Sequence, residues 1–268
     1  MPETGKSIPV VVFTGGPAIE AQVLRFVSRL EQESGIELLA IVSESPVRGF
    51  RGIVLDLWRR RGALAPVIFF RNILFAFLTT FRNPAAALGR RRALKSLASR
   101  THYFDNIHAD DALSLVRNLR AELGLVYGGP IVKPELFSIP ARGTLGIHHG
   151  RVPFYRGKKT TFWALYNGEP EVAVIIQKIG SKLDAGDIVG QAAVRVRNRP
   201  LPLVRKELET AGIDLYLKAI AAVANGTETY TPQPAGGRRL YKDPNAIDIL
   251  RFWGRYFARL LRGKNAAP

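Results

Sequence analysis

An apolar run rich in β-branched residues, Ile8–Thr14, ends in a pair of glycines, and apolar side chains then recur at the spacing of one helical face as far as Leu30. A second apolar run covers Ile36–Val42. Strand, helix and strand in this order and at this spacing are typical of a parallel α/β sheet. The start of the chain therefore predicts an α/β fold.

The same alternation returns in the middle of the chain and predicts a mostly parallel central sheet. Helices are expected over Asp110–Leu123, Thr161–Tyr166 and Leu203–Val223, and strands over Leu125–Tyr127, Thr144–His148 and Val172–Ile179. We expect one α/β domain over residues 1–225, interrupted by a basic helical insertion at about 46–100, and a short basic C-terminal extension over 226–268.

The basic residues are concentrated in two segments. Residues 46–104 hold 12 Lys and Arg against the single acid Asp56, and residues 238–268 hold 8 against Asp243 and Asp248. These two segments account for the whole net charge of +17. Local surfaces of this kind attract nucleic acid, acidic lipid or anionic substrates, and charge alone does not choose among them.

The insertion contains a long apolar stretch, Gly62–Phe81, with Arg71 at its middle. An Arg at the centre of a membrane-spanning helix costs about 2.5–3.5 kcal/mol on insertion scales, which argues against a transmembrane helix. Two interpretations remain: peripheral contact of a helix with an acidic membrane surface, or an insertion that packs its apolar stripe on the core or on a second subunit. We favour the second because apolar stripes at helical spacing usually belong to a core.

The residue types present exclude several kinds of site. The chain has no Cys, so it can form neither a disulfide framework nor a thiolate zinc site, and it has no cysteine nucleophile. With four His and no HExxH spacing, we expect no metal site. The N-terminus lacks the basic and apolar pattern of a signal peptide, so we expect a cytoplasmic protein.

Two motifs in the second half of the chain carry the chemistry. The first is Gly146-Ile147-His148 followed by Val-Pro-Phe-Tyr-Arg-Gly at 152–157, and the second is Leu183-Asp184-Ala185-Gly186, with 36 residues separating His148 from Asp184. Together they resemble the folate-dependent formyltransferases, a family that includes glycinamide ribonucleotide, methionyl-tRNA and sugar N-formyltransferases. The resemblance covers roughly residues 8–45 and 101–225.

The resemblance implies a Rossmann-like formyltransferase fold, with His148 and Asp184 as catalytic residues and 10-formyltetrahydrofolate as donor of a formyl group to a primary amine. The chemistry of these residue types agrees. The amine nitrogen must lose a proton while the carbonyl oxygen becomes negative, and a histidine can carry that proton near neutral pH. A carboxylate can orient the imidazole and a water that relays the proton.

The sequence departs from the family pattern at Gly146, where the family usually has an Asn. That Asn is expected to donate a hydrogen bond to the developing oxyanion, and losing such a donor typically costs on the order of 10²–10³ in rate. Gln177 is our candidate replacement and third catalytic residue, because it is a polar residue inside an apolar run; an edge or solvent-facing Gln is the alternative. The next histidine, His149, is expected to point away from this side of the strand. Without a replacement, the chain would be a catalytically weak or inactive formyltransferase-like binding protein.

The resemblance also implies binding residues at strand ends and turns. Backbone groups at two turns would contact the folate, and residues after the first strand and at a helix start would face the acceptor, where exposed N–H groups and a lysine favour an anion. The expected folate-binding residues are Gly129, Pro130, Ile131, Val132, Gly180, Ser181, Lys182 and Leu183. The expected acceptor-binding residues are Gly15, Gly16, Arg156, Gly157 and Lys158.

The acceptor is expected to be a small-molecule or nucleotide-linked amine such as an amino sugar. Methionyl-tRNA formyltransferases carry an additional C-terminal β-barrel, and the residues after the closing helix are too few for one. We therefore do not favour a nucleic-acid partner, although basic and aromatic residues alternate in Arg251–Phe257 as in some nucleic-acid proteins. The sequence leaves the oligomeric state open.

Overall fold

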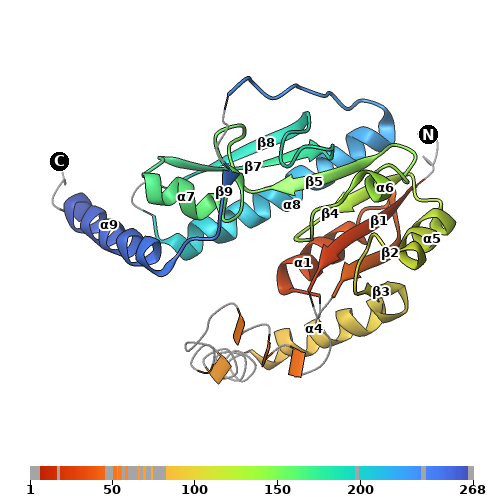
Figure 1. Cartoon of the computed structure of the whole chain (residues 1–268), viewed down its shortest axis with the longest axis horizontal. Helices are drawn as coiled ribbons and strands as arrows, with labels where there is room; N and C mark the ends of the chain where they lie inside the picture. The colour runs from red at the N-terminus through yellow and green to blue at the C-terminus, as the bar shows by residue number, and fades with distance from the viewer. Residues whose placement is uncertain are drawn as a thin grey trace. The chain divides into compact units, whose positions relative to one another are not determined.

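Figure 1 shows the computed structural model of the chain. The structure is described for residues 7–16, 19–45, 51–52, 54–55, 58–59, 66, 69–70, 74, 83–196, 199–236 and 240–264, with side chains as far as 258 in the last helix. The chain divides into two compact units, Met1–Ala141 and Arg142–Pro268.

The first unit is built on four parallel strands in the order β3-β2-β1-β4. The strands are β1 (Ile8–Gly15), β2 (Ile36–Glu44), β3 (Thr101–Phe104) and β4 (Leu123–Val126). The connecting helices are α1 (Ala21–Leu30), α4 (Pro84–Leu97), the short 3-10 helix η2 (Ala98–Arg100), α5 (Asp110–Leu119) and α6 (Pro134–Phe137). β1 lies between two neighbouring strands and is buried along almost its whole length, which its valine-rich sequence permits.

Helices cover the β1 strand on both faces. Val11 and Phe13 pack in one cluster with Val116 of α5 and with α6. On the other side, Phe26 of α1 stacks on Tyr127, which follows β4, with ring centroids 4.5 Å apart. The alternation of side chains along the strand therefore supplies apolar contacts to two helical layers.

The predicted end of the helix that starts at Asp110 is wrong. The helix stops at Leu119, because Arg120 adopts a left-handed conformation with φ 52°, and Leu123 already belongs to β4. The apolar Leu123 fits the helical spacing and the strand equally well, so periodicity alone did not separate the two elements.

The basic insertion is described only in part. Its last section forms α4, whose first turn is capped by Asn83: the Ala86 N–H donates to the Asn83 side chain at 3.1 Å, and Pro84 follows the cap. Most of the apolar stretch Gly62–Phe81, on which the two interpretations of the insertion rest, lies outside the described residues. Over the part of the chain that the structure describes, no helix combines the length and the hydropathy needed to cross a membrane.

The second unit contains three antiparallel strands in the order β5-β7-β8. These are β5 (Thr144–His148), β7 (Glu171–Lys178) and β8 (Ile188–Arg195). The long helix α8 (Leu201–Asn225) packs on β7 and β8 (Figure 1), and α7 (Thr160–Asn167) contacts β7. Two short strands, β6 (Arg156–Gly157) and β9 (Leu240–Tyr241), form a separate parallel pair, and β9 is followed by the last helix, α9 (Ala246–Lys264).

The α/β class and the Rossmann-like, mostly parallel arrangement are confirmed. The sequence did not predict β8, because most of its residues are small or polar and only Val194 is fully buried. The division into a domain over 1–225 and an extension over 226–268 stays a prediction. Within the extension, Thr231 forms an antiparallel bridge with Ile188 at the start of β8, and β9 pairs with β6.

Candidate active site

The two predicted catalytic residues lie together in the second unit. His148 is the last residue of β5 and is 8% exposed. Its Nδ1 atom is 3.3 Å from Oδ1 of Asp184, and its Nε2 atom is 2.7 Å from the backbone oxygen of Tyr155. Residues from the two sequence motifs therefore form one hydrogen-bonded group.

The partners of His148 suit a group that holds a proton. One ring nitrogen faces a carboxylate oxygen and the other a carbonyl oxygen, and both oxygens only accept hydrogen bonds when the carboxylate is ionised. A neutral imidazole can donate to one of them, whereas an imidazolium can donate to both. The arrangement can thus hold a proton that a bound amine releases.

Asp184 is positioned by the backbone around it. Its φ is 48°, a left-handed conformation, and its side chain accepts a hydrogen bond from the Gly157 N–H at 2.8 Å. Arg156 donates from Nε to the preceding carbonyl of Leu183 at 3.1 Å. A side chain at Gly186 would collide with the Lys178 carbonyl, which explains the glycine of this motif.

Gln177 lies directly across from Gly146. The two residues are register partners in the antiparallel pair of β5 and β7, so their side chains share one face of the sheet with His148. Gln177 is 3% exposed, which excludes a solvent-facing Gln, and its Nε2 lies 3.5 Å from Oδ1 of Asp184. His149 lies on the opposite side, where its Nε2 is 3.8 Å from a Cβ built on Gly212 of α8.

Sequence reasoning missed Gln233, which lies in the C-terminal extension. Its Nε2 is within hydrogen-bonding distance of the Gln177 Oε1 at 3.1 Å, the Asp184 carbonyl at 3.1 Å and the Gly186 carbonyl at 2.8 Å. Gln233 therefore connects the residue opposite Gly146 to the turn that carries Asp184. The available signal was its position between two prolines, which restrict the backbone on both sides of a polar residue.

A tight turn after β5 closes over His148. A Cβ added at Gly150 would lie 2.6 Å from Nε2 of His148 and would also collide with the carbonyl of Tyr155. The absence of a side chain at Gly150 lets the Tyr155 carbonyl reach the histidine. In the sequence, Gly150 begins the Gly-Arg-Val that precedes Pro153.

The expected acceptor-binding residues of this unit have structural contacts of their own. Arg156 and Gly157 form β6 and contact the Asp184 turn. Lys158 is exposed and forms a surface ion pair with Asp243, with Nζ and Oδ2 3.4 Å apart. Contact of these residues with an acceptor stays a prediction.

The expected folate-binding residues fall in two groups. The turn before Asp184 is open to solvent: Gly180, Ser181 and Lys182 are exposed, and Leu183 is 39% exposed. The other group belongs to the first unit, where a Cβ on Gly129 would lie 3.1 Å from Cα of Thr14.

The first-unit residues expected to bind folate and acceptor are brought together by the pairing of β1 with β4. A Cβ on Gly15 would lie 3.2 Å from Cδ of Pro130, and the Gly16 N–H donates to the Glu44 carbonyl at 2.9 Å. Ile131 is 66% exposed, whereas Val132 is buried in the core, so Val132 can offer a ligand only its backbone.

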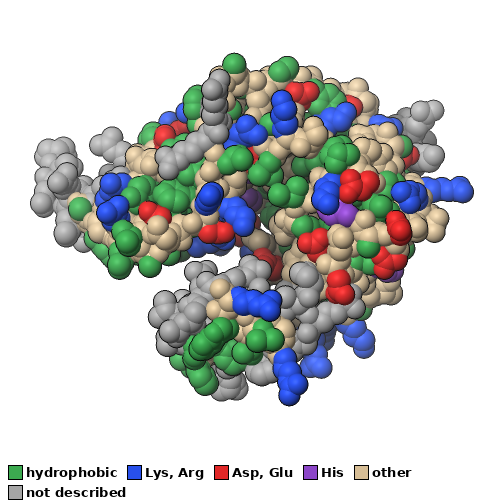
Figure 2. Space-filling model, in the orientation of Figure 1, with side chains coloured by type: hydrophobic (Ala, Val, Ile, Leu, Met, Phe, Trp, Pro, Cys, Tyr) green, Lys and Arg blue, Asp and Glu red, His purple; other side chains and the backbone are tan. Residues whose placement is uncertain are grey.

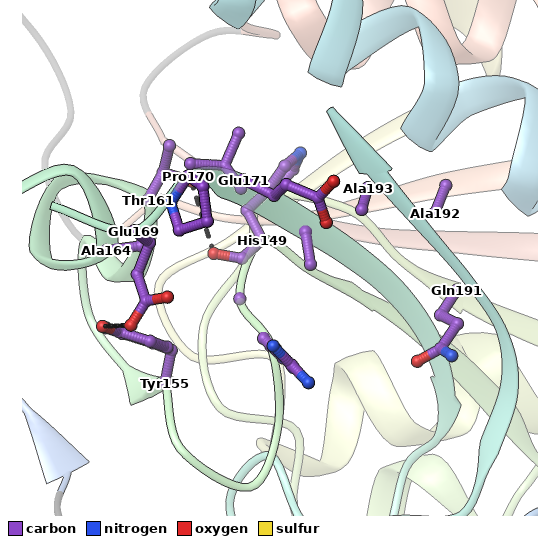
Figure 3. A pocket seen from close by; sticks show the side chains of 14 residues that line it. His149, Tyr155, Thr161, Ala164, Glu169, Pro170, Glu171, Gln191, Ala192 and Ala193 are labelled. Atoms are coloured by element: carbon purple, nitrogen blue, oxygen red, sulfur yellow. Dashed lines mark hydrogen bonds between the residues drawn. The ribbon is translucent and has the colours of Figure 1, made fainter. Parts of the chain in front are cut away.

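A separate pocket of about 280 Å³ lies in the second unit (Figure 3). Neither His148 nor Asp184 lines it. Burial, with a smaller effect of His148, lowers the pKa of His149, one of its lining residues, to about 4. Tyr155 donates its hydroxyl to Glu169 at 2.7 Å, and burial raises the pKa of that hydroxyl to about 12. His149 is therefore neutral near pH 7. Among the residues described, no group of three or more His, Asp or Glu could hold a metal ion.

Comparison with known proteins identifies relatives of this chain. Residues 80–210 match the family model described as Formyl transferase. A methionyl-tRNA formyltransferase from Leifsonia xyli is 30% identical over 197 residues, which are 68% of this chain and 65% of that protein. Another from Roseiflexus castenholzii is 34% identical over 158 residues, 56% and 49% of the two chains. The chain spans less than two thirds of the length of each.

Solved structures share the fold. Phosphoribosylglycinamide formyltransferase from Anaplasma phagocytophilum superposes with a TM-score of 0.59 at 16% identity, covering 89% of this chain and 100% of that one. A sugar N-formyltransferase from a Shewanella species gives a TM-score of 0.55 at 13% identity, covering 91% and 86%.

Proposed function

Residues 80–210 belong to the formyl transferase family, and we propose that the chain transfers a formyl group from 10-formyltetrahydrofolate to a primary amine, with His148 as general acid and base and Asp184 as its partner. The observation that carries the proposal is the 3.3 Å approach of His148 Nδ1 to Asp184 Oδ1. Two residues 36 positions apart, one from each motif, come together where the His148 side chain is buried.

The residues around Asp184 fit a folate. The family generally uses 10-formyltetrahydrofolate, which supplies the formyl group when bound. The exposed turn Gly180–Leu183 presents backbone groups next to Asp184, and a flat heterocycle with alternating donors and acceptors is bound well by such groups. We therefore propose that this turn contacts the folate, and contact of the Gly129–Val132 backbone with it stays a separate prediction.

The chain's own residues handle the proton. The amine nitrogen that forms a bond to the formyl carbon must lose a proton, and the nitrogen that leaves the formyl carbon must gain one. His148 can take the first proton and return it to the leaving nitrogen, while Asp184 holds the ring in place. Gln177 stands in for the missing Asn, because its buried amide lies opposite Gly146 on the His148 side of the sheet.

We propose a small-molecule or nucleotide-linked amine, such as an amino sugar, as the acceptor. A second candidate is the amine of methionyl-tRNA, favoured by the relatives of 30% and 34% identity and by the excess of basic residues. Incubation with the folate donor and either methionyl-tRNA or nucleotide-linked amino sugars, followed by mass spectrometry for the added formyl group, distinguishes them.

The test of the activity itself starts with the donor. Calorimetric titration with a stable formyl-folate analogue should show saturable binding, and His148→Ala should bind the analogue but transfer no formyl group. Folded protein that binds no analogue would refute the folate-dependent function. Binding without turnover on any amine would favour the alternative, an inactive formyltransferase-like binding protein with Gly146 in place of Asn.

A further inference from the structure

The last helix, α9, is attached to the second unit along one face. Phe252 is 6% exposed, and its ring centroid lies 5.1 Å from that of Phe162 on α7. Arg255 lies over the ring of Tyr166, 4.6 Å from its centroid. These contacts fix which side of the helix faces the unit and which side faces away.

The side that faces away is apolar. Ile247, Leu250, Trp253 and Phe257 follow one another at helical spacing and are 58%, 72%, 43% and 55% exposed. The rings of Trp253 and Phe257 stack on each other, 5.7 Å apart. Figure 2 shows green apolar side chains beside blue basic ones on the part of the surface that α9 forms. Large side chains of this kind, gathered on one helix, mark an interaction surface.

The charge on α9 is almost entirely positive. Its sequence contains five Lys and Arg and one acid, Asp248. That acid is used at the start of the helix, where Asn245 N–H donates to its Oδ2 at 3.0 Å and its own N–H donates to Asn245 Oδ1 at 2.8 Å. A carboxylate at this end is favoured by the helix dipole and leaves the rest of the helix basic.

We propose that α9 lies in the surface of a membrane that contains acidic lipid, with the four apolar residues at the boundary of headgroups and acyl chains and Arg251 on lipid phosphates. An amphipathic helix that has Trp, Phe and Leu on one face and five Lys and Arg in its sequence has the composition of an interfacial helix. Trp253 lies at the edge of the apolar face, and tryptophan rings prefer the headgroup level of a membrane.

Other occupants fit the surface less well. A second copy of α9 would bring together two helices that each have five Lys and Arg and one acid in their sequence, and like charges oppose such contact. A nucleic acid could stack on Trp253 and Phe257, but it would leave Ile247 and Leu250 in water, because aliphatic side chains offer no stacking surface to a base. An acidic lipid surface buries all four apolar side chains and offers phosphates to Arg251.

The test is flotation of the full chain with vesicles of phosphatidylcholine alone or of equal parts phosphatidylcholine and phosphatidylglycerol. We expect binding to the acidic vesicles and a blue shift of tryptophan emission that the variant Trp253→Phe abolishes. The double substitution Leu250→Glu with Phe257→Glu should weaken the partition by at least about tenfold, because each side chain contributes more than 1 kcal/mol when buried. Leu203→Glu on α8, 55% exposed, is the matched control and should bind as the wild type does.

Several results would overturn the proposal. These are no binding to either vesicle, equal binding to both, or equal binding by the double variant and the wild type, which would assign the lipid contact to another surface such as the basic insertion. A dimer that forms without lipid and dissociates in the double variant would make the face a contact between copies. Circular dichroism of each variant confirms that loss of binding is not loss of the fold.

Discussion

The amide of Gln233 donates a hydrogen bond to Oε1 of Gln177 across 3.1 Å, although 56 residues separate the two in sequence. Because Oε1 of Gln177 is engaged by this donor, its Nε2 is turned toward Asp184. The same Gln233 nitrogen also lies against the carbonyls of Asp184 and Gly186. The extension thus orients the side chain that we propose as the replacement for the missing Asn.

Gln233→Leu should lower kcat by about tenfold while the KM values for donor and acceptor stay nearly unchanged, because lost neutral hydrogen bonds are worth about 1 kcal/mol each. Steady-state kinetics measure this split. Gln32→Leu, at an exposed position of the first unit, is the control and should match the wild type. Equal loss of kcat and stability in both variants, or a change in KM alone, would contradict a positioning role.

Asp184→Asn should lower turnover by about 10²–10⁴, because the neutral amide no longer supports a protonated His148. Asp187→Asn, an exposed acid in the same turn, should retain near wild-type turnover. Single-turnover formyl transfer, followed by mass spectrometry, separates this chemical effect from product release. Comparable activity of the Asp184 and Asp187 variants would remove Asp184 from the mechanism.

Gly146→Asn tests whether Gln177 has taken over the role of the missing side chain. Gln177→Leu alone should reduce kcat by about 10²-fold if its amide stabilises the oxyanion. Adding Gly146→Asn to that variant should restore part of the loss, because the new amide sits opposite the same position. A Gln177→Leu enzyme with wild-type kcat would show that another group or a water serves as the donor.

Gly150→Ala should destabilise the turn over His148 and reduce turnover at least about tenfold, since the new methyl group must displace either the ring or the Tyr155 carbonyl. The expected loss of unfolding free energy is about 1–3 kcal/mol. Gly35→Ala, where a Cβ meets no atom within 4 Å, is the matched substitution and should change neither quantity. Urea unfolding and kinetics on both variants provide the comparison.

The elements with strong apolar patterns could be predicted from the sequence. The sequence also contains the two motifs whose residues His148 and Asp184 lie together in the structure. It predicted Thr144–His148 without error, because a short apolar run there ends at a polar residue. It failed where the pattern was weak: β8 offers few large apolar residues, and Leu123 fits two kinds of element.

The contacts of Gln233 and Gly150 could not be predicted in the same way. A hydrogen bond between residues 177 and 233 depends on how the extension runs past β8, where Thr231 bridges Ile188, and no periodicity encodes that path. The need for a glycine at position 150 becomes visible only when the Tyr155 carbonyl and the His148 ring are both placed. Local patterns predict elements, whereas close approaches between distant segments follow from packing.

The buried ring of His149 should make the folded state sensitive to acid. Burial lowers its pKa to about 4, below the ordinary value of about 6.5 that the unfolded chain has. Between these values the unfolded state binds more protons than the folded state, so stability is lost as the pH falls through this range. From about pH 7 to about pH 5, this residue should cost the wild type about 2 kcal/mol of unfolding free energy. The variant His149→Gln lacks the titrating group. Its unfolding free energy, measured in urea at about pH 7 and about pH 5, should therefore fall by about 2 kcal/mol less than that of the wild type. His102→Gln, at a half-buried position of β3, serves as the control, and an identical pH dependence of the His149 variant and the wild type would show that the ring is solvated.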